Sequence, residues 1–250
     1  MSGLTDLWES PPEELALSRQ DIHIWRASLE LDVSSEARLA EILSPDERER
    51  AARFYFERDQ KRFIAGRGIL RTILSYYLDA NPNQLRFSYG AHGKPALAGP
   101  ETLDFNLAHS QGLALYAIAR ERRIGVDVEH VRTVSDAEEI AGRFFSPHEN
   151  AVFRELPESL KQQGFFNCWT RKEAYIKAIG RGFAGPIDNF DVSLAPGEPA
   201  ALLSIQGNSL AASDWSIQEL KPGPGYVAAV ATEGSGWQLA CWRWSLEFKL

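Results

Sequence analysis

Two carboxylates, Asp127 and Glu129, stand two residues apart in the run Gly-Val-Asp-Val-Glu that ends at residue 129. Side chains of a strand alternate between its faces, so Asp127 and Glu129 share one face and Val126 and Val128 share the other. Carboxylates about 7 Å apart along a strand repel each other unless a cation lies between them, and such oxygen ligands suit Mg²⁺. The pair indicates either a magnesium site or the solvated face of an ordinary strand.

The segment from Trp169 to Lys177 is predicted to be helical and carries a third carboxylate with two lysines. Helical spacing places Trp169, Glu173 and Lys177 on one stripe, with Lys172 beside it. Glu173 four residues before Lys177 is also the favourable order for a salt bridge within a helix. In the other interpretation, Glu173 binds the same cation as Asp127 and Glu129, and the two lysines bind phosphate oxygens.

Further groups could hold an anion. His109 comes at the end of a predicted strand, in the run Asn-Leu-Ala-His-Ser that ends at Ser110. The run Gly93-Lys94-Pro95 predicts a tight turn with its lysine at the surface. Residues 47–71, with Arg62 among them, hold eight arginines and lysines against four acids. These features predict phosphate binding or, as the alternative, a structural histidine and an ordinary basic helix surface.

The elements that must position these groups show a faint internal repeat. Ser-Pro-Asp-Glu at 44–47 and Ser-Pro-His-Glu at 146–149 lie 102 residues apart. Each predicts a helix start, with serine at the N-cap, proline in the first turn and glutamate closing a capping box. We therefore expect two similar α+β halves related by a pseudo-twofold axis, residues 1–121 and 122–250.

Apolar periodicity and turn residues predict the remaining elements. Helices are expected at 45–58, 60–78, 135–145, 147–156 and 164–179. Strands are expected at 22–27, 86–89, 102–107, 113–119, 124–129, 190–194, 215–220, 226–232 and 237–244. Helices alternate with clustered, hairpin-like strands, which favours an α+β fold over a doubly wound one.

Composition excludes several classes of protein. The 250 residues are 44% hydrophobic, enough for a real core, and carry a net charge of −7, which argues against broad nucleic-acid binding. Two cysteines make a disulfide scaffold or a zinc cluster implausible. The start has no basic and apolar signal pattern, and no apolar run reaches the ~20 residues that span a bilayer. We expect a cytoplasmic protein with no membrane partner.

Taken in order, these motifs resemble the 4′-phosphopantetheinyl transferases of the Sfp/HetI type. The matching stations run from about residue 43 to residue 182. They are the basic helices with Arg62, the Gly-Lys-Pro turn at 93–95, Asn-Leu-Ala-His-Ser at 106–110, Gly-Val-Asp-Val-Glu at 125–129, Phe-Phe-Ser at 144–146 and Trp-Thr-Arg-Lys-Glu-Ala at 169–174. The family's two-lobed monomer also agrees with the repeat.

The resemblance implies an enzyme that transfers 4′-phosphopantetheine from coenzyme A to a serine of an apo acyl or peptidyl carrier protein. Adenosine 3′,5′-bisphosphate would be released. The N-terminal half would hold the 3′-phosphate and adenine, and the C-terminal half would hold the metal and the catalytic helix. A monomer is implied, and Mn²⁺ is a possible substitute for Mg²⁺.

The resemblance also implies a role for each candidate residue. Asp127, Glu129 and Glu173 would hold Mg²⁺, and Glu173 could instead accept the serine proton, a role that competes with metal binding. The coenzyme A ligands would be Lys172 and Lys177 at the pyrophosphate, Arg62 and His109 near the 3′-phosphate, and Lys94 beside the adenine. Glu173 and Lys177 would be the catalytic pair.

Two other functions stay open. A carrier-protein or coenzyme A binding module that no longer transfers would be expected to lack one of the acidic residues or Lys177, and none is lost. A Mg²⁺-dependent nucleotide phosphohydrolase would cleave its substrate whether or not a carrier protein is present. Product analysis with and without the carrier separates the two reactions.

Overall fold

The computed structural model describes residues 8–90, 93–99, 103–180 and 187–247, and it confirms a mixed α+β fold. The α-helices are α1 (Val33–Glu41), α2 (Pro45–Ala52), α3 (Glu57–Leu78), α4 (Ala137–Phe144), α5 (Pro147–Glu155), α6 (Glu158–Ile179) and α7 (Ser209–Ala212), with a short 3₁₀ helix at Pro82–Gln84. The strands are β1 (Asp21–Ser28), β2 (Phe87–Tyr89), β3 (Pro95–Leu97), β4 (Leu103–Ser110), β5 (Leu113–Arg120), β6 (Ile124–His130), β7 (Phe190–Val192), β8 (Leu202–Ile205), β9 (Trp215–Leu220), β10 (Tyr226–Glu233) and β11 (Gln238–Arg243).

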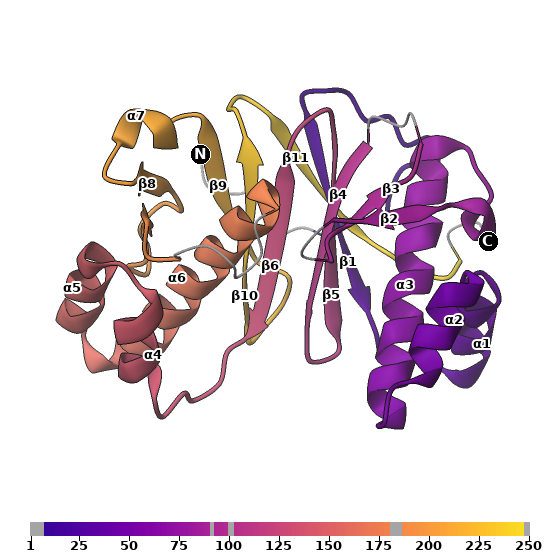
Figure 1. The fold of residues 1–250 in the computed structure, drawn as a ribbon, viewed down its shortest axis with the longest axis horizontal. Coiled ribbons are helices and arrows are strands. Elements are labelled where there is room, and N and C mark those ends of the chain that lie inside the picture. The colour runs from indigo at the N-terminus through magenta and orange to yellow at the C-terminus, as the bar shows by residue number, and fades with distance from the viewer. Residues whose placement is uncertain (1–7, 91–92, 100–102, 181–186, 248–250) are drawn as a thin grey trace.

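Two main sheets occupy the middle of the molecule, and one long helix covers the outer face of each (Figure 1). The first sheet has the strand order β11-β1-β5-β4 and packs against α3; the second has the order β6-β10-β9 and packs against α6. A third apolar cluster joins the facing sides of the two sheets, where Ala108 of β4 meets Val126 and Val128 of β6. The two smaller sheets are β2-β3 and β7-β8.

The two capping boxes form as predicted. Ser44 begins α2 and Ser146 begins α5, and in each helix the glutamate three residues on accepts a bond from the N-cap backbone. A short helix then leads into a 22-residue helix in both halves, α3 or α6. Both long helices end in a left-handed residue, Asp79 or Gly180. The repeat in the sequence therefore corresponds to a repeated arrangement of helices and strands.

Several predicted boundaries were wrong. The helix expected over 45–58 stops at Ala52, and α3 begins at Glu57, three residues earlier than the expected start at 60. The residues between the two helices include three exposed aromatic side chains, Phe54, Tyr55 and Phe56. The last long helix begins six residues earlier than expected, at Glu158. The short elements α1, α7, β3 and β8 were not predicted. One strand was expected to begin at residue 102, and this residue lies outside the described ranges.

The C-terminal strand returns to the first sheet. β11 pairs in parallel with β1 and continues the ladder of the N-terminal sheet, not that of β9 and β10. The segment 122–250 is thus not a self-contained layer, although the division at residues 121 and 122 itself stays a prediction.

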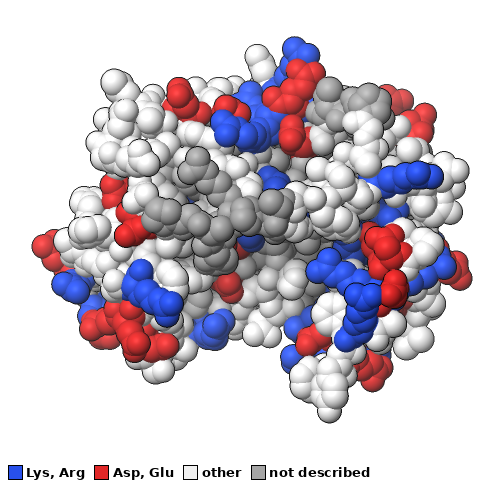
Figure 2. All heavy atoms as spheres, viewed as in Figure 1, with Lys and Arg blue, Asp and Glu red and all other residues white. Residues whose placement is uncertain are grey.

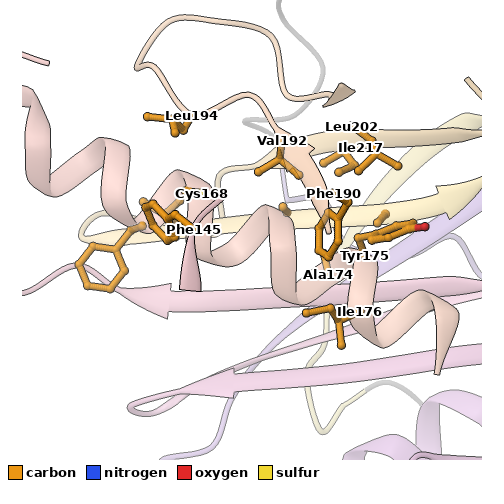
Figure 3. Close-up of a cluster of buried hydrophobic side chains, with 14 of the residues drawn as sticks. Phe145, Cys168, Ala174, Tyr175, Ile176, Phe190, Val192, Leu194, Leu202 and Ile217 are labelled. Carbon is orange, nitrogen blue, oxygen red and sulfur yellow. The ribbon is translucent and has the colours of Figure 1, made fainter. Parts of the chain in front are cut away.

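The core of the second half lies between α6 and its sheet (Figure 3). Phe145, Cys168 and Tyr175 are among its buried side chains, so Cys168 serves as a small core residue. Its burial raises the pKa of the thiol well above the ordinary value, which keeps it unreactive. None of the helices in the described ranges is long and apolar enough to cross a membrane.

Candidate functional site

The carboxylates of β6 face α6, as the alternation predicts. Val126 and Val128 are buried between the two sheets, whereas Asp127, only 5% exposed, lies on the face toward α6. Gly125 makes this close approach possible, because a Cβ at that position would come within 2.1 Å of the Ala174 carbonyl oxygen. The strand and the helix can therefore bring their polar side chains into contact.

Helix α6 supplies Glu173 and Lys177 to the same place. The Lys177 ammonium lies 2.7 Å from Asp127 Oδ1 and 3.3 Å from the Val126 carbonyl oxygen. Among the described residues, no ion pair joins Glu173 to Lys177, which instead pairs across to the strand. Lys177 therefore forms its ion pair with Asp127 of the strand and not with Glu173 of its own helix.

Two carboxylate oxygens in this group are buried without a partner. Within the described residues, Asp127 Oδ2 and Glu173 Oε1 have no hydrogen bond. Burial is the main cause that raises the pKa of Asp127 to about 6 and that of Glu173 to about 7, and nearby carboxylates raise both further. Lys177 opposes both shifts. Unpartnered oxygens beside one another in a buried site are the donors that a divalent cation would satisfy.

The carboxylates do not form a complete metal cage on their own. No group of three acidic, histidine or cysteine residues in the described ranges is arranged to hold a metal ion. Glu129 Oε2 accepts a hydrogen bond from the Ser110 hydroxyl at 2.9 Å. Mg²⁺ usually takes one or two protein carboxylates, with waters and substrate phosphate oxygens completing its shell. The donor set fits such a shared site, in which the substrate supplies the remaining ligands.

Three anion-binding candidates from different elements, two cations and a histidine, gather next to the carboxylates. His109 of β4 lies close enough to Lys177 of α6 and Arg62 of α3 for both to lower its pKa, after the larger effect of burial, while Glu129 raises it. Arg62 is held by two hydrogen bonds to Glu30 Oε1, at 2.9 and 2.6 Å. An anion placed here would meet positive charge from both halves of the chain.

The prediction for Lys172 was wrong. Its side chain is 1% exposed, and its ammonium donates to both oxygens of Glu149 and to the Phe190 carbonyl, at 2.7 to 2.8 Å. All three N–H donors are thus used inside the core, so Lys172 has none left for a phosphate. It neutralises the capping-box glutamate of α5.

Lys94 is only partly exposed, whereas the sequence had suggested a fully exposed surface lysine. Its ammonium donates to the backbone carbonyls of Lys177, at 2.7 Å, and Ile124, at 3.1 Å. A cation beside the last carbonyls of a helix is favourable for the helix dipole. The lysine of the Gly93-Lys94-Pro95 turn thus joins the end of α6 to the start of β6, and its proposed place beside the adenine stays a prediction.

Sequence reasoning missed two features of the site. Glu30 holds Arg62 from 32 residues away, and no local pattern links the two. A cavity of about 130 Å³ opens beside Glu129, and its lining comes from three segments of the chain: Glu129, Arg132, Val134, Ile140, Phe165, Phe166 and Trp169. Trp169 itself stacks on Phe165 and meets Phe144 edge-on.

The face of the molecule in Figure 2 shows positive and negative side chains interspersed, without a broad region of one sign. Such a surface does not resemble the continuous basic patch of a general nucleic-acid binding protein. The cations of the site lie instead at one place between the two halves.

Comparison with known proteins identifies the chain. Residues 123–231 match the model of the 4′-phosphopantetheinyl transferase superfamily, and residues 32–121 match a 4′-phosphopantetheinyl transferase N-terminal model. The transferase HetI of Nostoc sp. is 45% identical over 96% of this chain and 100% of its own length. Sfp of Bacillus subtilis is 31% identical over 66% of this chain and 72% of its own.

A solved apo-ACPS structure overlaps 46% of this chain and 98% of its own, with a TM-score of 0.34 and 18% identity. The full-length similarity to HetI, together with the two family models, shows that this chain belongs to the 4′-phosphopantetheinyl transferase family and is an enzyme of that class.

Proposed function

We propose that this transferase moves 4′-phosphopantetheine from coenzyme A to a serine of an apo acyl or peptidyl carrier protein, with Mg²⁺ at Asp127, Glu129 and Glu173. The observation that carries the metal proposal is the pair of buried, unpartnered oxygens on Asp127 and Glu173. When bound, Mg²⁺ would neutralise charge that builds up on the phosphate oxygens. Mn²⁺ has the same preference for oxygen ligands and is expected to substitute.

The chain's own groups divide the reaction between them. The serine oxygen attacks the β-phosphorus of coenzyme A, the bond to the bridging diphosphate oxygen breaks, and adenosine 3′,5′-bisphosphate leaves. Glu173 accepts the serine proton, directly or through a water, as the alternative to its place beside the metal, and without a metal its pKa is about 7. Lys177, which is already directed into the site by Asp127, would stabilise the charge of the pyrophosphate.

Binding of the nucleotide end draws on the first half of the chain. Arg62 and His109 would hold the 3′-phosphate, and the turn that contains Lys94 would lie beside the adenine. We therefore assign residues 1–121 to the coenzyme A 3′-phosphate and adenine, and residues 122–250 to the metal and the catalytic helix. One chain supplies both sets, which supports a monomer.

We also propose a cytoplasmic location. Both cysteines, Cys168 and Cys241, are free and buried, as is usual in a compartment that keeps thiols reduced.

The test is the intact mass of an apo carrier protein after incubation with this enzyme, coenzyme A and Mg²⁺. A gain of one phosphopantetheine, absent when EDTA is added, is expected. Assays with several acyl and peptidyl carriers guard against a narrow partner preference. Coenzyme A binding without any mass gain would favour the non-catalytic binding module, and release of the bisphosphate without carrier would favour a phosphohydrolase.

A further inference from the structure

The two main sheets meet along β4 and β6 without a shared ladder. β4 is the last strand of the first sheet and β6 is the first strand of the second, and they lie side by side at the centre of the molecule (Figure 1). Within the described residues, β6 pairs with β10 of its own sheet and with no strand of the first sheet. The backbone groups on the other edge of β6 therefore need partners of another kind.

Side chains of β4 supply two of these partners at regular spacing. Asn106 Oδ1 accepts a hydrogen bond from the Val126 N–H at 2.9 Å, and Ser110 Oγ accepts one from the His130 N–H at 3.0 Å. Both bonds span 20 residues, so the two strands run parallel in one register between them. Asp127 and Glu129 lie between these two points of attachment.

Ser110 has a second role in the same geometry. While its oxygen accepts from the His130 N–H, its hydroxyl donates to Glu129 Oε2 at 2.9 Å. A hydrogen bond to an ionised carboxylate is stronger than a neutral one. One side chain therefore holds both the end of β6 and the orientation of Glu129.

We propose that Ser110 and Asn106 are positioning residues, which set the register of β6 against β4 and hold Glu129 ready for the metal. This inference rests on the proposed function only in taking Glu129 as a metal ligand. Asn106 is 6% exposed, so its bond to β6 is shielded from water and strengthened.

The arrangement also links the two binding regions. His109 and Ser110 are neighbours on β4: the charges of Lys177, Arg62 and Glu129 all act on His109, and Ser110 donates to Glu129. A shift of β4 relative to β6 would separate the proposed 3′-phosphate ligands from the proposed metal ligands. The side-chain attachments keep the two at a constant separation.

The test compares Ser110→Thr with Ser110→Val, which have nearly the same shape and differ in the hydroxyl. Binding of Mn²⁺ is titrated by electron paramagnetic resonance, with adenosine 3′,5′-bisphosphate present and no carrier protein. We expect Ser110→Val to bind Mn²⁺ about 10- to 100-fold more weakly than the wild type and Ser110→Thr to stay near it, as for other residues that orient metal ligands. Nucleotide affinity without metal should be unchanged in both.

Two controls separate positioning from a general loss of structure. Ser216→Ala removes a strand hydroxyl that donates to the Gly234 carbonyl, in another part of the second sheet, and should leave Mn²⁺ binding unchanged. In a Glu129→Ala background, the difference between Ser110→Thr and Ser110→Val should become smaller, because the hydroxyl then holds only the His130 N–H and no longer a metal ligand.

Equal Mn²⁺ affinity of the two Ser110 variants would overturn the proposal, and so would a difference that is undiminished in the Glu129→Ala background. A wild type that fails to bind Mn²⁺ would overturn it as well. Since no carrier protein takes part, a wild type that binds Mn²⁺ but transfers nothing would contradict the proposed function and leave this inference standing.

Discussion

The two halves bury an ion pair of the same design. In the first, Glu47 of the α2 capping box pairs with Arg71 of α3 at 2.6 Å; in the second, Glu149 of the α5 capping box pairs with Lys172 of α6 at 2.7 Å. The two long helices are offset by 101 residues, which places Arg71 at the position of Lys172. Only one half carries the carboxylate site, whereas both halves carry this ion pair. The ion pair therefore stabilises the fold and is not part of the site.

The halves differ where the first strand crosses the long helix. In the first half, the Tyr77 hydroxyl bonds with His23 Nδ1 and accepts from Trp25 Nε1, both at 2.8 Å. The offset of 102 residues between the capping boxes places His23 at Gly125 and Trp25 at Asp127. In the first half, large hydrogen-bonded side chains thus fill the space between the strand and the helix. In the second half, a glycine lets the strand and the helix approach more closely, and a carboxylate oxygen beside them has no partner among the described residues.

This difference separates stability from function. The first crossing satisfies its polar groups internally, as buried polar groups usually are. The second leaves Asp127 and Glu173 with raised pKa values, which costs free energy of folding that a bound cation would recover. Functional sites commonly carry such a cost.

The largest expected effect comes from removing the acidic group at the second crossing. Asp127→Asn should lower the rate of Mg²⁺-dependent transfer about 10³-fold or more, because a bound metal contributes several kcal/mol to charge stabilisation. The measurement is the initial rate of carrier modification at saturating Mg²⁺. Asp191→Asn, which alters a carboxylate bonded to Ser146 and Ser204 outside the site, is the matched control. Near-normal turnover of Asp127→Asn would contradict the metal assignment.

The shared ion pairs should differ in what remains when one cation is removed. Lys172→Met leaves the buried Glu149 without its cation and should lower the free energy of unfolding by about 3–5 kcal/mol. Arg71→Met leaves Glu47 paired with Arg67 at 2.7 Å, so it should lower the free energy of unfolding by less. Neither should change kcat/KM for coenzyme A in the folded fraction. Lys177→Met, by contrast, should lower kcat/KM about 10- to 150-fold. This factor corresponds to a loss of about 1.5–3 kcal/mol of transition-state stabilisation from one charge-assisted hydrogen bond.

Denaturant unfolding combined with single-substrate kinetics on the same preparations distinguishes these variants. A loss of coenzyme A affinity in Lys172→Met as large as in Lys177→Met would restore the phosphate-binding role that the structure denies to Lys172.

A smaller effect is expected on the pH dependence of stability: the free energy of unfolding should respond to pH in opposite directions at the two crossings. Burial lowers the pKa of His23 to about 4, so the unfolded chain binds a proton more tightly there. The stability that His23 contributes is fully present above its unfolded pKa of about 6.5 and is lost as pH falls toward 4, in total about 3 kcal/mol. His23→Gln should remove that part of the acid sensitivity.

At the second crossing the sign reverses. The pKa of Asp127 is raised to about 6, so the folded state binds the proton more tightly. Its contribution is present below its unfolded pKa of about 3.8 and is lost as pH rises through 6, again about 3 kcal/mol. In metal-free protein, Asp127→Asn should therefore be more stable than the wild type at pH 8 and similar at pH 4. Parallel pH profiles for His23→Gln and Asp127→Asn, measured by urea unfolding, would show that the crossings do not differ in this way.

Much of the site could be predicted because its signals are local. Alternation along β6 placed Asp127 and Glu129 on one face, spacing of four placed Glu173 and Lys177 on one stripe of α6, and the capping boxes marked two helix starts. Each of these follows from the backbone geometry of a single element. The order of the motifs along the chain was enough to indicate the family.

Only the tertiary structure decided which partner each side chain meets. Lys172 and Lys177 are close in sequence on one helix, yet one points into the core at Glu149 and the other reaches Asp127. The same holds for Lys94, whose ammonium donates to a carbonyl in the last turn of α6, and for β11, which pairs with β1. Local sequence sets which way a residue faces on its own element, but packing between distant elements determines what lies opposite, and that information is spread over the whole chain.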